Sequence, residues 1–201
     1  MKVWVVKYGE TIPFLWPQRQ NHFFRSGELV RRLARRGHHV HWWTGRFEHQ
    51  TKSHLENFPA SVAVADTPVT IELLDSPGYR SNISVQRFYD HWRIARAFRQ
   101  RLRNAAPPDL ILASYPTLEL AEVARAYAAA AGIPFIVDVR DMWPDVITER
   151  LSAHLRVPVP PILLHYNAMA RRILGRADSV VSISQPFLQW AQERGGRTDR
   201  Q

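Results

Sequence analysis

The sequence contains no cysteine, which excludes disulfide bonds and thiolate metal sites. It also lacks an apolar run of the roughly 18 to 20 residues that a membrane-spanning helix needs. Its first residues, MKVWVVKYGE, reach a glutamate too early for a signal peptide. We therefore expect a cytoplasmic protein that is either soluble or peripheral to a membrane.

The motifs of several common enzyme classes are missing too. There is no GxGxxG of dinucleotide-binding proteins, no GxxxxGK[ST] of P-loop proteins, no HExxH of zinc proteases and no GxSxG of serine hydrolases. The histidines show no metal-ligand spacing, and His38, His39 and His41, clustered at a strand start, are expected to be structural or solvated. We predict neither a metal nor a cofactor.

Lysine is scarce, so arginine carries most of the positive charge. The 27 basic residues include only three lysines, and the net charge is +9. Arginine suits bidentate contacts to phosphate, and a basic surface is attracted to anionic lipid. Genomic base composition and solvated helix faces explain the same bias without a partner. Because no nucleic-acid-binding motif accompanies the arginines, we predict no nucleic-acid partner.

Apolar segments alternate with amphipathic ones along the chain. Strands are predicted at 2–7, 39–44, 69–74, 109–114, 134–139 and 179–184. Helices are predicted within the segments 26–39, 86–104, 115–132, 161–175 and 185–193. Gly37 is expected to end the first helix, and Thr117 and Gly132 to cap and close the third. Because the strands are apolar throughout, this order predicts an α/β fold with a doubly wound, mostly parallel sheet and helices on both faces.

We assign one lobe to residues 1–194, and a polar tail or the start of an interdomain linker to 195–201. The helix at 86–104 is amphipathic, and its buried stripe is predicted to be Phe88, Trp92, Ala95, Phe98 and Leu102. Ligands of such folds bind beyond the carboxyl ends of the strands. The candidate loops are 8–25, 45–52, 74–82, 114–117, 140–145 and 184–186.

One of these loops lies in the decapeptide IVDVRDMWPD, residues 136–145. Asp138 lies within or just past a strand, and Arg140, Asp141 and Trp143 fall on the loop that follows, where an acid and a guanidinium can meet a ligand. Alternatively, Arg140 pairs with Asp138 or Asp141 only to satisfy the loop, and Trp143 packs in the core. The spacing leaves both interpretations open.

Several segments together carry a family resemblance. The two most specific segments are RGHHVHWWT and DVRDMWPD. Three others occur with them in the order that the family has: SPGYRSNISVQRFYDHWRIARAF, PDLILASYPTLELA and ADSVVSISQPFLQWA. Over nearly the whole chain the sequence resembles the N-terminal lobe of family 4 glycosyltransferases of the GT-B fold, in a subgroup that builds bacterial cell-envelope polysaccharides. The resemblance implies a Rossmann-like acceptor-binding lobe facing a cleft. The C-terminal donor lobe is absent from this sequence.

The resemblance also implies the chemistry. A sugar moves from a nucleotide-sugar to an acceptor, commonly lipid-linked, with retention of configuration and without a metal, at the inner face of the cytoplasmic membrane. In that setting Asp141 and Arg140 are the candidate catalytic residues, one orienting the acceptor hydroxyl and the other binding a phosphate. The candidate acceptor-binding residues are Glu10, Arg19, Asn21, Arg25, Tyr79, Arg80, Asn82, Tyr115, Asp138, Trp143 and Ser184.

Some of these assignments have alternatives. The loop after the first strand, YGETIPFLWPQRQNHFFR, lacks the family's usual Gly-rich turn and either contacts the acceptor or only packs its aromatics. Tyr115 either stacks on a sugar or packs at the sheet edge.

The chain as a whole is expected to be inactive alone, as the acceptor half of a transferase. The alternative is a non-catalytic binding or scaffold protein. A fragment should leave the PFLWP segment, 13–17, exposed, whereas a stand-alone lobe should not.

Overall fold

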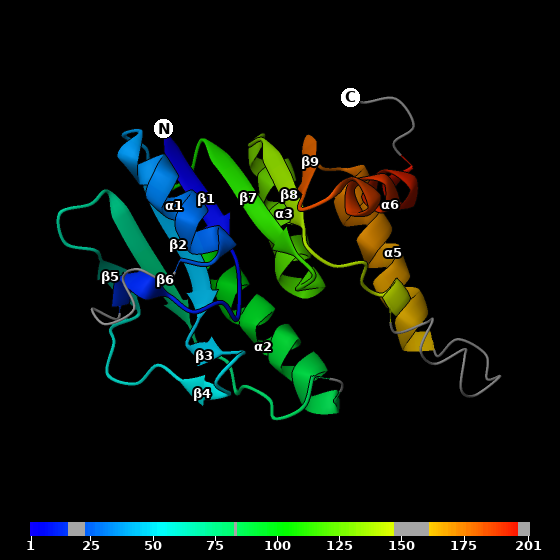
Figure 1. The fold of residues 1–201 in the computed structure, drawn as a ribbon, viewed down its shortest axis with the longest axis horizontal. Helices are drawn as coiled ribbons and strands as arrows, with labels where there is room; N and C mark the ends of the chain where they lie inside the picture. The colour runs from blue at the N-terminus through cyan, green and yellow to red at the C-terminus, as the bar shows by residue number, and fades with distance from the viewer. Residues whose placement is uncertain (16–22, 83, 147–160, 197–201) are drawn as a thin grey trace. The chain divides into compact units, whose positions relative to one another are not determined.

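The computed structural model describes residues 1–15, 23–82, 84–146 and 161–196. Within these ranges a seven-stranded, mostly parallel sheet has the order β5-β6-β2-β1-β7-β8-β9 (Figure 1). Its strands are β1 (Lys2–Val6), β2 (His39–Gly45), β5 (Ser61–Ala63), β6 (Val69–Leu74), β7 (Leu110–Tyr115), β8 (Phe135–Val139) and β9 (Ser179–Ser182). The predicted α/β fold class is confirmed.

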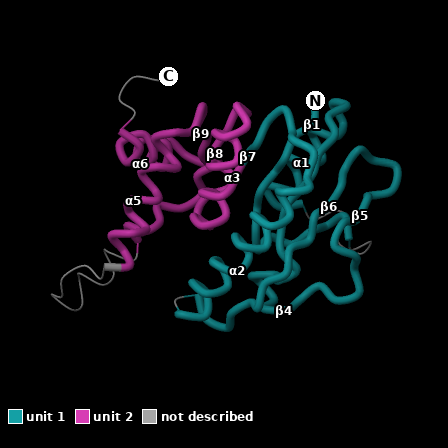
Figure 2. The backbone as a smooth tube through the Cα atoms, turned by 180° about the vertical axis from the view of Figure 1, so that it is seen from behind, with its two compact units in different colours: residues 1–112 teal, residues 113–201 magenta. Residues whose placement is uncertain are grey.

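The other elements are a short antiparallel pair and the helices. The pair is β3 (Phe47–Glu48) and β4 (Ser53–His54). The helices are η1 (Pro13–Leu15), α1 (Arg25–Arg35), α2 (Val85–Leu102), α3 (Leu118–Ala131), α5 (Pro161–Gly175) and α6 (Gln185–Gly195). The chain divides into two compact units, Met1–Leu112 and Ala113–Gln201, which are described separately below (Figure 2).

In the first unit, α1 and α2 cover opposite faces of the sheet. Strands β1, β2 and β6 run parallel, with Val5 paired to Trp42 and Trp42 to Ile71. These three side chains share one buried core with Val30 of α1. On the other face, the ring of Trp43 packs against Phe98 of α2, with the ring centroids 5.2 Å apart.

Helix α2 differs from its prediction at two residues of the buried stripe, because Phe88 is only half-buried and Trp92 is exposed. Ala95, Phe98 and Leu102 are buried as expected, but Trp92 is 51% exposed. The buried positions 90, 91, 94, 95, 98 and 102 follow the helical period, so position 92 falls at the border of that face. Trp92 instead stacks on exposed Tyr89, with the ring centroids 5.9 Å apart.

The second unit packs α5 against α3 and α6 and pairs β8 with β9 in parallel. The Tyr166 hydroxyl on α5 donates a hydrogen bond to Glu119 of α3. Gly132 ends α3 in the left-handed conformation, with φ 66°, as predicted from its position. Thr117 stands at the N-cap of α3, but its side chain makes no capping hydrogen bond, so that part of the prediction was wrong.

The PFLWP segment is not left exposed over the part that the structure describes. Leu15 belongs to the core of the first unit, and Phe14 packs against that core, edge-to-face with Trp42. Trp16 and Pro17 lie outside the described residues. The loop therefore packs its first apolar side chains inward, and it does not distinguish a fragment from a stand-alone lobe.

Candidate functional site

The loop after β8 begins with a buried ion pair. Asp138, the fourth residue of β8, is 2% exposed. Arg140 Nε donates to Asp138 Oδ2 over 2.8 Å, with the arginine side chain 15% exposed. A carboxylate this deeply buried needs a positive partner, because removal from water strongly disfavours its charge. Arg140 therefore stabilises the end of the strand, one of the alternatives that the sequence left open.

The other two acids of the loop have different surroundings. Asp145 accepts hydrogen bonds from Trp190 Nε1 (2.8 Å) and from Arg194, and so anchors α6. Asp141, half-buried, accepts only the N–H of Met142 (2.8 Å) among the described residues. Of the three acids in the decapeptide, Asp141 is therefore the one with an oxygen that is left for a ligand.

Trp143 and Tyr115 are part of the packing beneath this loop. Trp143 lies edge-to-face with Tyr166, with the ring centroids 5.3 Å apart. Tyr115 is fully buried, and its hydroxyl donates to the Trp143 carbonyl. Burial raises the pKa of the Tyr115 hydroxyl. In this conformation Tyr115 positions the loop and offers no ring face to a sugar. Ser184 is exposed at the N-cap of α6.

On the loop after β1, Glu10 occupies the start of a helix. Its Oε1 accepts hydrogen bonds from the N–H groups of Ser26 (2.9 Å) and Gly27 (3.2 Å), in the first turn of α1. A carboxylate there satisfies free N–H groups and interacts favourably with the helix dipole. Arg25, the first residue of α1, is exposed. Arg19 and Asn21 lie outside the described residues.

A second group of polar side chains lies on the loops beyond β2 and β6 and in the first turn of α2. We call His49, Lys52, Tyr79, Asn82 and Arg87 the basic–aromatic cluster. Buried Tyr79 is at its centre, and its hydroxyl lies 2.6 Å from His49 Nδ1. Lys52 Nζ is 4.5 Å from the centroid of the Tyr79 ring, and the Arg87 guanidinium carbon is 5.5 Å from it. Arg80 is exposed on the same loop as Tyr79.

Asn82 connects the two cations of the cluster. Its Oδ1 accepts a hydrogen bond from Lys52 Nζ (2.8 Å), and its backbone carbonyl accepts one from Arg87 (2.7 Å). Lys52 Nζ also lies 3.1 Å from His49 Nδ1. Because an ammonium group only donates, Nδ1 must be the acceptor, which fixes His49 as the neutral Nε2–H tautomer.

The charges of the cluster are poorly balanced by acids. Among the described residues, neither Lys52 nor Arg87 forms an ion pair with a carboxylate. Burial lowers the pKa of His49 to about 4, with help from the positive charges of Lys52, Arg87, Lys7 and His91. Burial, and then the charge of Arg87, also lowers the pKa of Lys52. The cluster therefore holds two positive charges, Lys52 and Arg87, that no carboxylate of the described residues pairs with.

The nearest acid of α2 is already satisfied beneath the cluster. Asp90, fully buried, accepts hydrogen bonds from the Tyr8 hydroxyl (2.5 Å) and from the N–H of Gly78 (2.7 Å). Gly78 has φ +74°, and a Cβ there would come within 2.5 Å of Phe47. Asp90 therefore joins the loop after β1, the loop after β6 and α2, and fixes the backbone next to Tyr79.

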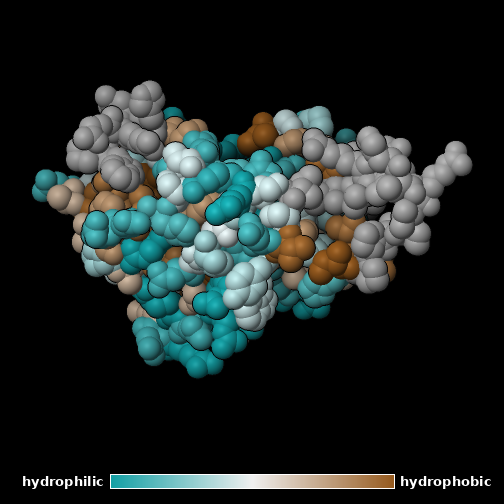
Figure 3. Space-filling view, turned by 90° about the horizontal axis from the view of Figure 1, so that it is seen from below, coloured by the Kyte–Doolittle hydropathy of each residue, from teal (hydrophilic) through white to brown (hydrophobic). Residues whose placement is uncertain are grey.

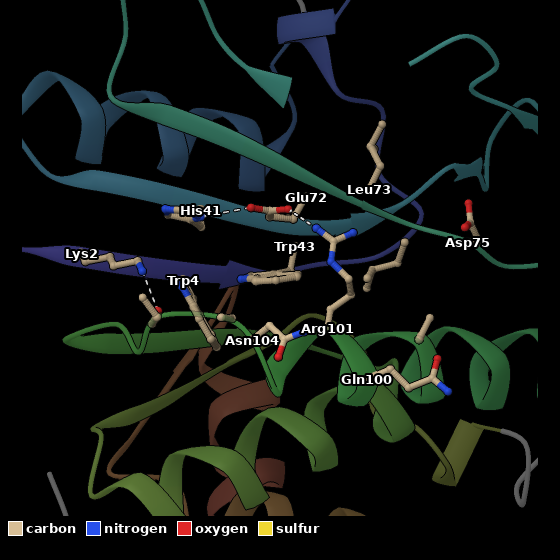
Figure 4. A pocket seen from close by; sticks show the side chains of 14 residues that line it. Lys2, Trp4, His41, Trp43, Glu72, Leu73, Asp75, Gln100, Arg101 and Asn104 are labelled. Carbon is tan, nitrogen blue, oxygen red and sulfur yellow. Dashed lines mark hydrogen bonds and ion pairs between the residues drawn. The ribbon is translucent and has the colours of Figure 1, made fainter. Parts of the chain in front are cut away.

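A groove of about 540 Å³ lies elsewhere in the first unit, between the second half of α2 and the sheet (Figure 4). Glu72 in its wall accepts from Arg101 (2.6 Å) and lies 3.4 Å from His41 Nδ1. Burial acts to raise the pKa of Glu72, but His41 and Arg101 together hold it below its usual value. None of the predicted site residues lines this groove.

The described ranges contain neither a cluster of metal-ligand side chains nor a helix of membrane-spanning length and hydropathy. No group of three or more His, Cys, Asp or Glu side chains in those ranges is arranged to hold a metal ion. No helix there has both the length and the hydropathy of a membrane span.

Sequence reasoning included Tyr79 and Asn82 but missed His49, Lys52 and Arg87. His49 and Lys52 lie on a candidate strand-end loop, so their position was available. Their contact with Tyr79 depends on tertiary structure that no local pattern encodes.

The comparisons with known proteins agree with this fold. The family model for the glycosyl transferase 4-like domain matches residues 25–201. No curated protein matches the sequence. UGT89C1 of Arabidopsis thaliana, solved in complex with UDP, is 14% identical with a TM-score of 0.51, over 98% of this chain and 49% of that one. Os79 of O. sativa, also solved with UDP, is 14% identical with a TM-score of 0.49, over 98% and 50%.

The chain thus spans about half the length of these structures. UGT89C1, above a TM-score of 0.5, supports a single lobe of the GT-B glycosyltransferase fold. On the match over residues 25–201, the chain belongs to the family of glycosyl transferase 4-like domains.

Proposed function

We propose that this chain is the acceptor-binding N-terminal lobe of a retaining, metal-independent glycosyltransferase. The sugar comes from a nucleotide-sugar, and the acceptor is a lipid-linked glycan of the cell envelope. The chain needs a C-terminal donor lobe and is inactive alone. The observation that carries the proposal is the family match over residues 25–201. The half-length coverage of UGT89C1 supports a single lobe.

We assign Asp141 to the reacting centre. Its carboxylate is half-buried and accepts only one local N–H among the described residues. It can accept a hydrogen bond from the acceptor hydroxyl and orient it toward the donor. Arg140 acts through its ion pair with Asp138, which holds the strand end from which Asp141 projects. We therefore propose Arg140 as a positioning residue.

Exposed apolar side chains favour a missing partner lobe over a stand-alone scaffold. In the second unit, Ile162 and Leu164 of α5 are 51% and 61% exposed, and Ile183 after β9 is 52% exposed. A protein that had become a separate scaffold would be expected to replace such side chains with polar ones. We propose that a donor lobe covers them.

We also propose that the protein is peripheral at the inner face of the cytoplasmic membrane. The exposed side of α2 carries Tyr89 and Trp92, with the Arg93 guanidinium over the first ring at 5.9 Å and that of Arg96 over the second at 5.9 Å. Aromatic and basic side chains together are typical of membrane-surface helices. We expect the protein to sediment with anionic vesicles and not with neutral ones. The double variant Trp92→Ser/Arg96→Gln should lose this sedimentation. If the variant sediments with anionic vesicles as well as the parent does, the proposal is contradicted.

Sugar transfer itself tests the activity. The chain would be combined with a second α/β lobe encoded directly downstream or in a neighbouring frame, and supplied with labelled nucleotide-sugars and a membrane lipid extract. We expect labelled glycolipid only when both lobes are present, with the donor's anomeric configuration retained. Robust transfer by the 201-residue chain alone, or none by the pair with any donor, would contradict the proposal.

A further inference from the structure

The basic–aromatic cluster has the charge and geometry of an anion site. Lys52 and Arg87 are held close together because both bind Asn82. The two cations repel each other, since beyond the effect of burial the charge of Arg87 lowers the pKa of Lys52. Among the described residues no carboxylate pairs with either cation. An anion that contacts both would relieve the repulsion.

The backbone at Lys52 is a second, independent observation. Lys52 has φ +54°, in the left-handed region that glycine and asparagine adopt more readily than lysine. Such a conformation is strained for a residue with a side chain, and residues that keep it gather at functional sites. The position therefore carries a lysine where the backbone alone would favour a smaller residue, which points to a use for the ammonium group.

The chemistry narrows the class of anion. Lys52 and Arg87 supply two positive charges, and His49 is neutral near pH 7 because its pKa is about 4. A guanidinium beside an ammonium suits a group with two negative charges and several acceptor oxygens, as in a phosphate or diphosphate. The side of the molecule on which β3 and β4 lie is mostly hydrophilic, with hydrophobic side chains only in small groups (Figure 3). A polar ligand suits that surface.

We propose that Lys52 and Arg87, held around the ring of Tyr79 by Asn82, bind the diphosphate group of a substrate. Lys52 and Arg87 donate to its oxygens, and Tyr79 and Asn82 hold the two cations in place. Assigning this anion to a transferase substrate rests on the proposed function. The binding itself does not, so it is measured on the 201-residue chain without any transfer assay.

Inorganic pyrophosphate is the first probe, titrated calorimetrically into the purified chain. Lys52→Asn removes the charge while suiting the left-handed backbone, and Arg87→Gln removes the charge and keeps a good helix former. Losing one charge-assisted hydrogen bond should weaken binding about tenfold in each variant. The matched control is Arg103→Met, which removes a charge at the other end of α2, roughly 24 Å away along the helix.

The site is overturned if pyrophosphate does not bind, or if all three variants weaken binding equally, which is the result for a diffuse basic surface. A second readout is the pKa of His49 by NMR, which should rise from about 4 when the anion offsets the nearby cations. An unchanged His49 pKa at saturation also rejects the site.

Two further ligands distinguish the source of the diphosphate. A short prenyl diphosphate represents the lipid-linked acceptor, and UDP represents the donor. Displacement of pyrophosphate by the prenyl diphosphate supports the acceptor as the source. Displacement by UDP alone supports the site but assigns it to the donor, which would contradict the acceptor-lobe proposal while leaving the anion site intact.

Discussion

Arg140 and Asp138 form a buried ion pair at the end of β8, with Nε 2.8 Å from Oδ2. Asp138 is only 2% exposed, so the guanidinium of Arg140 takes the place of water beside its carboxylate. The three acids of the decapeptide therefore have different surroundings. Asp138 and Asp145 are held by partners within the fold, and Asp141 is the acid that we assign to the reaction.

The ion pair predicts which variants lose stability. Arg140→Ala leaves Asp138 without its guanidinium and should lower the free energy of unfolding by about 3 kcal/mol, near the low end for a broken buried pair. Asp141→Asn should change it by less than about 0.5 kcal/mol, since among the described residues that side chain bonds only its neighbour Met142. Urea unfolding measures both, and an Arg140→Ala protein as stable as the parent would show that the pair contributes nothing.

In the reconstituted two-lobe enzyme, Asp141→Asn should lower kcat at least about a hundredfold, as expected when a positioned acid is lost. The fold should be intact, because the amide can still accept the Met142 N–H. A modest loss of kcat, comparable to that of a surface substitution, would remove Asp141 from the reacting centre.

Tyr115→Phe tests the packing beneath the loop. The substitution deletes the hydroxyl that donates to the Trp143 carbonyl and leaves that acceptor buried, so unfolding should become easier by about 1 to 2 kcal/mol. Tyr89→Phe is the control, because Tyr89 is exposed and its hydroxyl accepts a hydrogen bond from Arg93 over 3.2 Å. Equal effects in the two variants would mean that the buried hydrogen bond has no special importance.

His49 predicts a pH dependence. In the folded protein its pKa is about 4, lowered by burial and by Lys52, Arg87, Lys7 and His91, whereas in the unfolded chain it has the ordinary value of about 6.5. Between these values the unfolded state binds the extra proton, so stability falls as the pH is lowered from about 6.5 toward 4. His49→Gln should flatten the pH profile in this window. A variant with the same slope as the parent would refute the assignment.

Glu10 predicts the effect of a lost helix cap. Glu10→Ala removes the acceptor of two N–H groups and the negative charge at the start of α1, which should cost about 1 to 2 kcal/mol of unfolding free energy. Glu10→Gln keeps an acceptor oxygen and should cost less. If Glu10→Ala leaves stability unchanged and only weakens acceptor binding, the side chain serves the ligand and not the helix.

The parallel framework was predictable because its signals are local. The strand at 69–74 and the helix at 161–175 have the predicted bounds, since a buried strand and an amphipathic helix each show in the pattern of apolar residues. The end of α3 at Gly132 was predictable too, because glycine readily adopts the left-handed conformation that closes a helix.

The short strands and the cluster were not predictable in this way. β3, β4 and β5 have two or three residues each, with no period to read. His49, Lys52 and Arg87 meet at Tyr79 only after the loops fold, and the left-handed backbone of Lys52 is invisible in the sequence. Trp92 was misplaced because the period fixes a helix face but not its border.

The most direct test of the acceptor-lobe account is what the isolated chain binds. The purified protein would be titrated in parallel with a lipid-linked glycan fraction from cell membranes and with a panel of nucleotide-sugars, and binding followed by NMR at the Asp141 signal. The account predicts that the glycan fraction shifts this signal and the nucleotide-sugars do not. Saturable shifts by a nucleotide-sugar, with none from the glycan fraction, would contradict it.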